Sequence, residues 1–348
     1  MRTRFESWIC LFGVSILSGF AQQNRPADRS ITLDVAVTDK SGKPVAGLQQ
    51  KDFTLLDNKQ PQKILSFQAV GGGAAPAGPP VEVILVVDEV NTPFTGVAIV
   101  RDQIEKFLGQ NGGALALPVS VALLDDSGKI VRTPVSRDGK ALIADVDQAD
   151  FGLRTIRKSV QGIFAAEDQQ QISLQGLGQL ADYETAKPGR KLVVWISPGW
   201  PLFFGLSMNL SSKDQQGIFN SVVDFSDAMR RARITLYNID PVGATQGEMH
   251  MSDYEQFFKG VKKPGQAVLA DLGLQPLAYR TGGRIFEASN DLAAEIATCV
   301  LDGTDYYVLG FDGLPADGPN EYHELEIKID KPKLTVRTRS GYYAQPFR

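Results

Sequence analysis

Hydrophobic and polar residues alternate in the part of the chain that follows residue 30. Residues 31–39, ITLDVAVTD, place apolar side chains at every second position, and residues 44–68 contain further short segments of this kind. Lys40-Ser41-Gly42-Lys43 and Asp57-Asn58 have the composition of turns between them. Residues 71–80, GGGAAPAGPP, show no apolar periodicity, which indicates a linker. The pattern therefore predicts a β-rich segment that ends in a linker.

The pattern changes after the linker. Residues 81–88, VEVILVVD, are an apolar run that ends on Asp88, which is typical of a strand buried on both faces. Residues 97–108 space their apolar side chains as an amphipathic helix does. This alternation of strands and helices predicts a mostly parallel sheet with helices on both faces. Further strands are expected at 119–125, 129–136, 191–197, 233–240 and 284–288, and further helices within 138–186 and at 221–232, 266–283 and 290–301.

The end of the chain returns to a β pattern. Residues 305–313, 321–330 and 333–343 read as strands that are separated by Gly- or Pro-rich connections. A β segment of about 40 residues buries too little surface to be stable alone, so residues 30–70 are expected to pair with residues 304–348. We therefore predict a small β-sandwich formed by the two chain ends, and an α/β domain over residues 81–303 that is inserted in it or flanked by it.

The first residues predict export. Arg2 and Arg4 precede the apolar stretch 8–20, and Gly19 and Ala21 have the small side chains that precede a signal cleavage site. Residues 1–21 are therefore expected to be a signal peptide, with an uncleaved anchor as the alternative. The protein is expected in the periplasm or outside the cell, with membrane contact only through this segment.

Net charge and cysteine content bear on the class of partner and on disulfide bonds. The formal net charge is −4, whereas nucleic-acid binders usually present a basic face, so a nucleic-acid partner is not expected. Cys10 lies in the predicted signal and leaves Cys299 alone, which excludes a disulfide within the mature chain. Cys299 lies in an apolar helical stretch, where a buried and inert thiol is expected. No sustained heptad fixes an oligomeric state.

The order of elements in the middle of the chain resembles a von Willebrand factor A domain. The residues that carry the resemblance are Leu85 to Asp88, the Gly189-Arg190-Lys191 opening of LVVWIS, and Tyr279 to Phe286. Together with the flanking segments 35–67 and 305–343, nearly the whole mature chain resembles exported, von Willebrand A-related proteins of the acidobacterial type. The resemblance implies a Rossmann-type fold that binds its ligands at the carboxyl ends of the strands.

A von Willebrand A domain with a working adhesion site holds Mg²⁺ on an Asp-x-Ser-x-Ser motif and on a Thr and an Asp from two other loops. In this chain Asp88 matches the first position and Thr92 the third, so these two are the candidate metal ligands. Val90 stands where the first serine is expected and offers no oxygen ligand, and Ser197 stands where the final aspartate is expected. The resemblance therefore implies a degenerate metal site, and no cofactor is expected.

The sequence offers residues for two other kinds of chemistry. Ser197 ends a strand and would be the nucleophile of a secreted serine hydrolase, but neither of the two histidines, His250 and His323, accompanies a GxSxG elbow. Asp125 to Gly128 follow a strand and resemble an acidic metal loop, although Gly128-Lys129 is typical of a turn. A non-enzymatic protein is therefore expected.

We interpret the sequence as an exported protein-interaction or adhesion-type module that binds a protein partner at the rim of its α/β sheet. The loop after Asp240 belongs to the same rim, and the aromatic residues of the rim either contact the partner or fill the degenerate metal pocket. One alternative is a structural or assembly module of the cell envelope that binds through its β-sandwich, and another is the hydrolase. The rim candidates are Asp88, Glu89, Asn91, Thr92, Ser197, Trp200 and Phe203.

Overall fold

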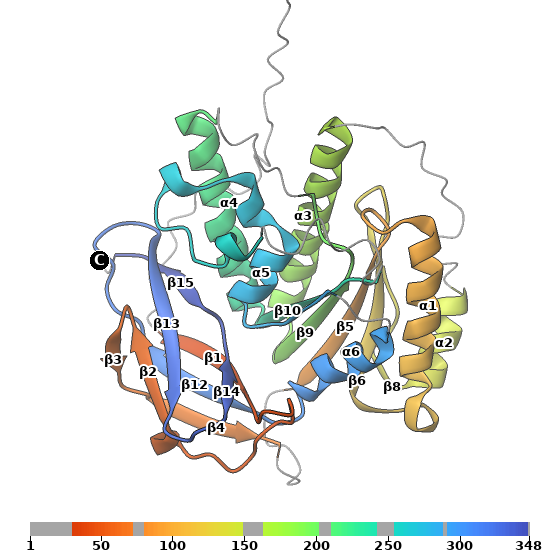
Figure 1. Ribbon diagram of the computed structural model, residues 1–348, viewed down its shortest axis with the longest axis horizontal. Helices are drawn as coiled ribbons and strands as arrows, with labels where there is room; N and C mark the ends of the chain where they lie inside the picture. Colours follow the sequence, from red (N-terminus) through yellow and green to blue (C-terminus); the bar gives the residue numbers. More distant parts are fainter. Residues whose placement is uncertain are drawn as a thin grey trace, which may run out of the picture.

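The computed structural model describes residues 30–71, 80–148, 163–201, 210–241, 254–287 and 291–346. They form an α/β part around one large sheet and a smaller part of two antiparallel sheets (Figure 1). The α/β part contains β5 (Val81–Asp88), α1 (Phe94–Leu108), β6 (Ala114–Leu124), β7 (Ile130–Arg132), β8 (Ser136–Asp138), α2 (Gly139–Gln148), α3 (Ile163–Thr185), β9 (Arg190–Ile196), α4 (Ser212–Arg231), β10 (Ile234–Ile239), α5 (Leu274–Arg280), β11 (Ile285–Phe286) and α6 (Leu292–Leu301). The smaller part contains β1 (Ser30–Thr38), β2 (Phe53–Asp57), β3 (Gln60–Gln62), β4 (Ser66–Val70), β12 (Tyr306–Asp312), β13 (Glu321–Ile329), β14 (Thr335–Arg337) and β15 (Gly341–Ala344).

Strand β5 lies in the interior of the large sheet, whose strand order is β11-β10-β9-β5-β6-β7, with β8 also paired to β6. β5 runs parallel to both neighbours, with Leu85 opposite Val121 on β6 and Val194 on β9. Only β7 and β8 run antiparallel to β6. Every residue of β5 except Glu82 is buried, which explains its continuous apolar run. The expected mixed α/β architecture with a mostly parallel sheet is confirmed, whereas the von Willebrand A assignment stays a prediction.

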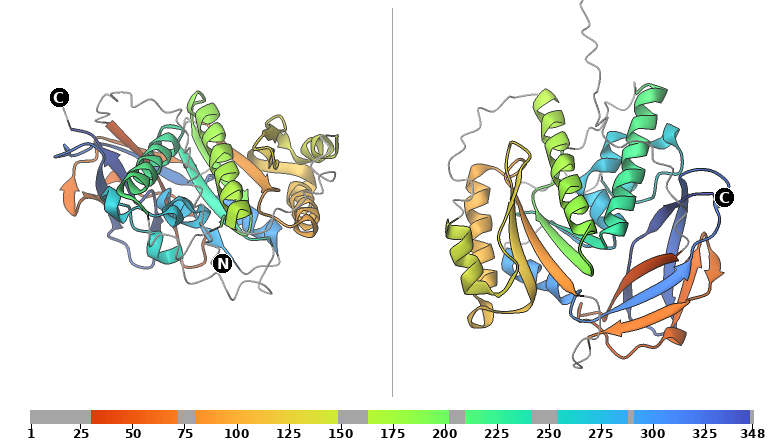
Figure 2. Two further views of the ribbon diagram at one scale, coloured as in Figure 1. Left: turned by 90° about the horizontal axis from the view of Figure 1, so that it is seen from above. Right: turned by 180° about the vertical axis from the view of Figure 1, so that it is seen from behind.

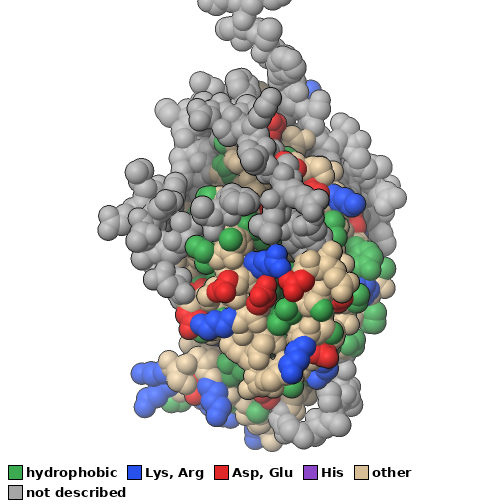
Figure 3. Space-filling model, turned by 90° about the vertical axis from the view of Figure 1, so that its right-hand side faces the viewer, with side chains coloured by type: hydrophobic (Ala, Val, Ile, Leu, Met, Phe, Trp, Pro, Cys, Tyr) green, Lys and Arg blue, Asp and Glu red, His purple; other side chains and the backbone are tan. Residues whose placement is uncertain are grey.

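Helices cover both faces of this sheet. One hydrophobic core joins it to α1, α2 and α6, and a second joins its other face to α3, α5 and the end of α4. The view from behind shows α3 and α4 side by side across the second face (Figure 2). The outer side of α1 and α2 carries acidic and basic side chains intermixed (Figure 3). Arg101 of α1, for example, pairs with Glu105 and Asp147.

The two chain ends form the smaller part together. One sheet has the order β14-β1-β12-β4 and the other β15-β13-β2-β3, so each combines strands from both ends of the chain. Both sheets contribute to a single core, in which the Phe53 ring of β2 lies 5.0 Å from the Tyr307 ring of β12. Two antiparallel sheets that share one core make a β-sandwich.

Ion pairs connect the sandwich to the α/β part, and one of them includes a buried carboxylate. The Asp302 carboxylate, which directly follows α6, is bound by Arg284 of the α/β part at 3.2 Å and by Arg337 of β14. A second pair joins Arg233, just before β10, to Asp34 of β1. Since a buried carboxylate requires such partners, these contacts fix one part against the other.

Four expected elements were wrong in extent. The strand expected at 333–343 is divided into β14 and β15, which belong to different sheets, and the helix expected at 221–232 already begins at Ser212. The helix expected at 266–283 is replaced by 3-10 turns at Pro264–Gln266 and Leu269–Leu272, and α5 begins only at Leu274. Pro276 explains this start, since proline is tolerated in the first turn of a helix but not in its interior. The strand expected at 129–136 is divided into β7 and β8 around Pro134, which has no N–H for a ladder.

Two further sequence predictions concern single elements. Cys299 is fully buried, as expected, and burial raises the pKa of its thiol well above the ordinary value. The predicted signal, residues 1–21, lies outside the described residues. Among the residues that are described, no helix is both long enough and apolar enough to cross a membrane.

Candidate functional site

The candidate site lies where β5 and β9 end next to one another. Val87 of β5 is opposite Ile196 of β9, so Asp88 and Ser197 both leave the sheet at its carboxyl edge. Open α/β sheets bind their ligands at this edge. The order of strands therefore brings together the residues that the sequence placed at one rim.

The Asp88 carboxylate accepts at least five hydrogen bonds from described residues. Its Oδ1 atom accepts the backbone N–H groups of Val90 at 3.0 Å and Asn91 at 3.1 Å. Its Oδ2 atom accepts the Asn91 side-chain amide at 2.8 Å and the indole N–H groups of Trp195 at 2.9 Å and Trp200 at 3.3 Å. Donors from three segments thus converge on one fully buried side chain.

The two tryptophans close the space over Asp88. Trp195 comes from β9, and Trp200 comes from the turn beyond it, with their rings edge to face at 5.5 Å. Trp195 is fully buried and Trp200 is 3% exposed. A buried indole N–H needs an acceptor, and Asp88 is the acceptor for both. The two indole rings therefore cover the Asp88 carboxylate.

These contacts argue against Mg²⁺ on Asp88. A cation at Oδ2 would face two indole N–H dipoles, which point their positive ends at this oxygen. Val90 is buried and apolar, and the Ser197 hydroxyl accepts the backbone N–H of Gly199 at 3.2 Å. Burial raises the pKa of Asp88, while hydrogen bonds from Trp195, Asn91 and Ser197 oppose the shift. The donor set does not fit a hard divalent cation, which prefers several charged oxygens.

Three oxygen atoms near Asp88 are buried and have no hydrogen-bond partner among the described residues. They are Glu89 Oε1, Asn91 Oδ1 and Thr92 Oγ1. The Asn91 amide nitrogen is meanwhile fixed between Asp88 and the Ser173 hydroxyl of α3, at 2.8 and 2.7 Å. These atoms are oxygen ligands in principle, but only Glu89 among them carries a charge. Thr92 alone therefore cannot complete a metal site with Asp88.

The Glu89 carboxyl group has a raised pKa. Burial and the nearby carboxylates of Asp125, Asp126 and Asp88 raise its pKa to about 7. Asp125 itself accepts the Ser127 and Lys129 backbone N–H groups at 2.9 and 3.0 Å, so residues 125–129 form a turn, as favoured from the sequence. The loop beside Asp88 therefore changes its charge near neutral pH.

The structure brings the predicted rim residues together but buries most of them. Asp88, Thr92, Ser197 and Trp200 are buried, and Glu89 and Asn91 are half-buried. Buried side chains cannot touch a partner directly, so Trp200 is part of the core, which is one of the two roles that the sequence left open for the rim aromatics. Phe203 and the loop after residue 241 lie outside the described residues.

The hydrolase arrangement is not assembled among the described residues. His323 lies on β13 in the sandwich, where its Nδ1 atom is 3.0 Å from Asp57 Oδ1 and 3.1 Å from the Tyr342 hydroxyl. Ser197 hydrogen-bonds to the backbone of Gly199 instead. His250 lies outside the described residues. The described histidine thus belongs to the sandwich core and does not activate Ser197.

Sequence reasoning missed three residues of this site. The sequence pattern places Trp195 only in a buried strand, and Gln169 and Ser173 only in a helix-compatible stretch. The Gln169 amide donates to the Val90 carbonyl at 3.1 Å, and Ser173 contacts Asn91. The one available signal was the polar N–H of a tryptophan inside an apolar strand, which requires a buried acceptor nearby.

Comparison with known proteins identifies no family. No family model matches the chain, and no curated protein matches it. Among solved structures, the open conformation of the pilus adhesin SpaC from Lactobacillus rhamnosus GG is similar, with a TM-score of 0.39 and 10% identity over 94% of this chain and 42% of the adhesin. A second form of that adhesin gives a TM-score of 0.36 and 9% identity over 94% and 43%. The chain thus spans less than half of the adhesin's length, and at these scores the similarity carries no functional argument.

Proposed function

We propose that this protein is an exported, non-enzymatic module that binds a protein partner and needs no metal ion to do so. Its α/β part is of the von Willebrand A type, and its sandwich is a rigid support. The support for the fold type comes from the strand order and from the sequence resemblance. The support for metal independence comes from the surroundings of Asp88.

The observation that carries the proposal is the set of donors around Asp88. An adhesion site works when a metal leaves a coordination position open for a partner's carboxylate. Here the corresponding carboxylate is fully buried and already binds two indole and two backbone N–H groups. The interaction must then use direct contacts between protein surfaces rather than a shared ion.

The test separates binding from metal dependence. A displayed library of random peptides is selected on the purified protein, once with millimolar Mg²⁺ and once with a chelator. We expect the same peptides to be enriched under both conditions. Enrichment only with Mg²⁺ would contradict metal independence, and no enrichment under either condition would contradict the binding function.

Two cheap measurements complete this test. The melting temperature is expected to stay constant when millimolar Mg²⁺ or Mn²⁺ is added. A metal ion raises the melting temperature only if it binds the folded protein, and we propose that the folded protein has no site for these ions. A serine-directed activity probe is expected to leave Ser197 unlabelled, because no histidine of the described residues is hydrogen-bonded to its hydroxyl, which contacts Gly199 and the buried Asp88 carboxylate. A metal-dependent rise of the melting temperature, or labelling of folded protein, would count against the proposal.

A further inference from the structure

The open edge of the large sheet at β7 has a groove beside it. β7 is the last strand in the order of the sheet, and among the described residues it pairs only with β6. The Asp125 N–H bonds to the Lys129 carbonyl and the Thr133 N–H to the Val121 carbonyl, so the odd-numbered residues of this segment face β6. Because the pattern alternates, the backbone groups of Ile130 and Arg132 face away from the sheet.

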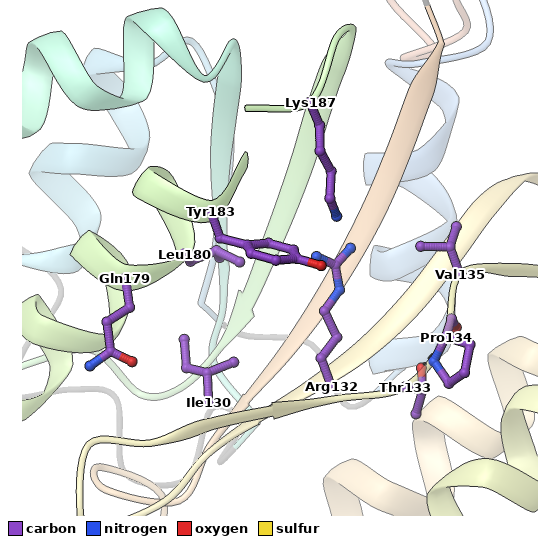
Figure 4. A pocket seen from close by; sticks show the side chains of 9 residues that line it. All are labelled: Ile130, Arg132, Thr133, Pro134, Val135, Gln179, Leu180, Tyr183 and Lys187. Carbon is purple, nitrogen blue, oxygen red and sulfur yellow. Dashed lines mark hydrogen bonds between the residues drawn. The ribbon is translucent and has the colours of Figure 1, made fainter. Parts of the chain in front are cut away.

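A cavity of about 570 Å³ lies between this edge and the end of α3. Ligand pockets are typically about 300–1,000 Å³, so it can hold side chains of a bound segment. Its wall combines apolar side chains with two cations and an aromatic ring (Figure 4). The lining residues are Ile130, Arg132, Thr133, Pro134, Val135, Gln179, Leu180, Tyr183 and Lys187.

The charged groups of the groove are only partly compensated. Arg132 pairs with Glu82 and with the fully buried Glu184, and Lys187 pairs with the same Glu184 at 3.1 Å. The Lys191 ammonium lies behind them and donates to the Glu184 and Lys187 carbonyls. Figure 4 shows Arg132 and Lys187 pointing toward one another beside the Tyr183 ring. Glu184 thus serves two cations, and the Lys187 side chain is 33% exposed.

Apolar side chains are exposed along the same edge. Tyr183 is 61% exposed, Val135 is 46% exposed, and Val131 is 37% exposed. The Lys187 ammonium lies 4.1 Å from the centre of the Tyr183 ring, so the ring and the cation form one surface. Exposed apolar side chains on an unpaired strand edge are what strand addition uses, whereas proteins that avoid it place charges or bulges there.

We propose that this edge binds an extended segment of a partner protein, which adds a short strand to β7 and places an acidic side chain at Lys187. The inference rests on the proposed protein-binding function and names the surface it uses. The segment pairs with the backbone of Ile130 and Arg132, and Pro134 limits the pairing because it has no N–H to offer. Side chains of a strand alternate, so the acidic residue and an apolar residue two positions away both face the groove.

The experiment uses a defined probe, a fluorescein-labelled peptide in which glutamate and valine alternate with threonine. We expect the purified protein to bind it, and Lys187→Gln to weaken binding about tenfold, which corresponds to the loss of one charged contact. The control Lys63→Gln changes an exposed lysine of the sandwich loop and should leave the affinity within about twofold. Circular dichroism and melting temperature check that both variants fold.

A second measurement tests strand addition itself. On binding, the backbone amides of Ile130 and Arg132 should become protected from hydrogen exchange, and a peptide with proline at its centre should bind at least about tenfold more weakly. Equal binding by the wild type and Lys187→Gln, or protection confined to another surface, would overturn the inference. If selected peptides bind but ignore Lys187→Gln, the binding function stands and only its location here fails.

Discussion

The Asp88 carboxylate occupies a position where the same side chain can serve a metal or the protein core. Its surroundings select the second use, since the chain supplies N–H donors from Val90, Asn91, Trp195 and Trp200. Each donor would be unsatisfied in the core without it. Val90, which offers no oxygen ligand, and the two indole donors therefore both favour packing around Asp88 over ion binding.

Removing this carboxylate should destabilise the fold strongly. Asp88→Ala leaves two buried indole and two backbone N–H groups without an acceptor, so we expect a loss of about 3–5 kcal/mol in the free energy of unfolding. Asp88→Asn keeps one oxygen acceptor and should lose less. Urea denaturation followed by tryptophan fluorescence measures both. The exposed Asp312 provides the control Asp312→Ala, and a loss for Asp88→Ala no larger than that of this control would contradict the prediction.

Glu89 should make stability depend on pH. Its pKa is raised from 4.5 to about 7 in the folded protein, so the folded state binds the proton more tightly than the unfolded state. The stabilisation is fully present below pH 4.5 and is lost as the pH rises through about 7. Glu89→Gln should match the wild type in acid and melt at a higher temperature than the wild type above neutral pH.

Melting curves of Glu89→Gln and the wild type from acid to above neutral pH test this prediction, with Glu255→Gln as the control for an exposed glutamate. The difference in melting temperature between Glu255→Gln and the wild type should stay constant over the same pH window. If the Glu89→Gln and wild-type melting temperatures stay parallel at every pH, Glu89 does not titrate as described.

At the scale of elements, the strands that the sequence predicted best are those buried on both faces. β5 and β9 are almost wholly buried because helices cover both sides, and their apolar runs at 83–87 and 192–196 can be recognised without tertiary information. The prediction of one helix over 266–283 was wrong because the apolar spacing of this segment suits a helix, whereas Pro276 confines α5 to the second half of the segment. No sequence pattern predicted the pocket beside β7, because this pocket depends on how the end of α3 lies against an edge strand.

The entry to β9 depends on a residue that has no side chain. Gly189 has a φ of +95°, and a Cβ there would meet the Pro80 carbonyl oxygen at 2.0 Å. Gly189→Ala should therefore cost about 2–4 kcal/mol from backbone strain and the clash, and displace the start of β9 from β5. The control Gly265→Ala has open space around its Cβ and no positive φ. Thermal and urea unfolding of the two variants give the comparison, and equal small losses would disprove this role for Gly189.

At the scale of the whole molecule, the resemblance to a von Willebrand A domain predicted which residues lie at the rim of the sheet but not that Trp200 covers Asp88 there. Sequence placed Asp88, Ser197 and Trp200 at one edge because parallel strands end together. It could not decide between exposure and burial of Trp200, since a loop side chain follows no periodicity. The pairing of residues 30–70 with the chain end could be anticipated, because neither segment buries enough surface alone.

Asp302 should determine whether the two parts unfold together. It is 1% exposed and binds Arg284 of the α/β part, Arg337 of the sandwich and the Tyr237 hydroxyl. Asp302→Ala leaves two partly buried guanidinium groups without their carboxylate, so we expect a loss of about 3–5 kcal/mol. Both described tryptophans lie in the α/β part, so their fluorescence reports on that part alone, whereas far-ultraviolet circular dichroism reports on both. In the wild type the two signals should change at one urea concentration, and in Asp302→Ala they should separate. The exposed Asp330 gives the matched control Asp330→Ala, and coincident transitions in Asp302→Ala would show that the coupling runs through other contacts, such as the pair between Asp34 and Arg233.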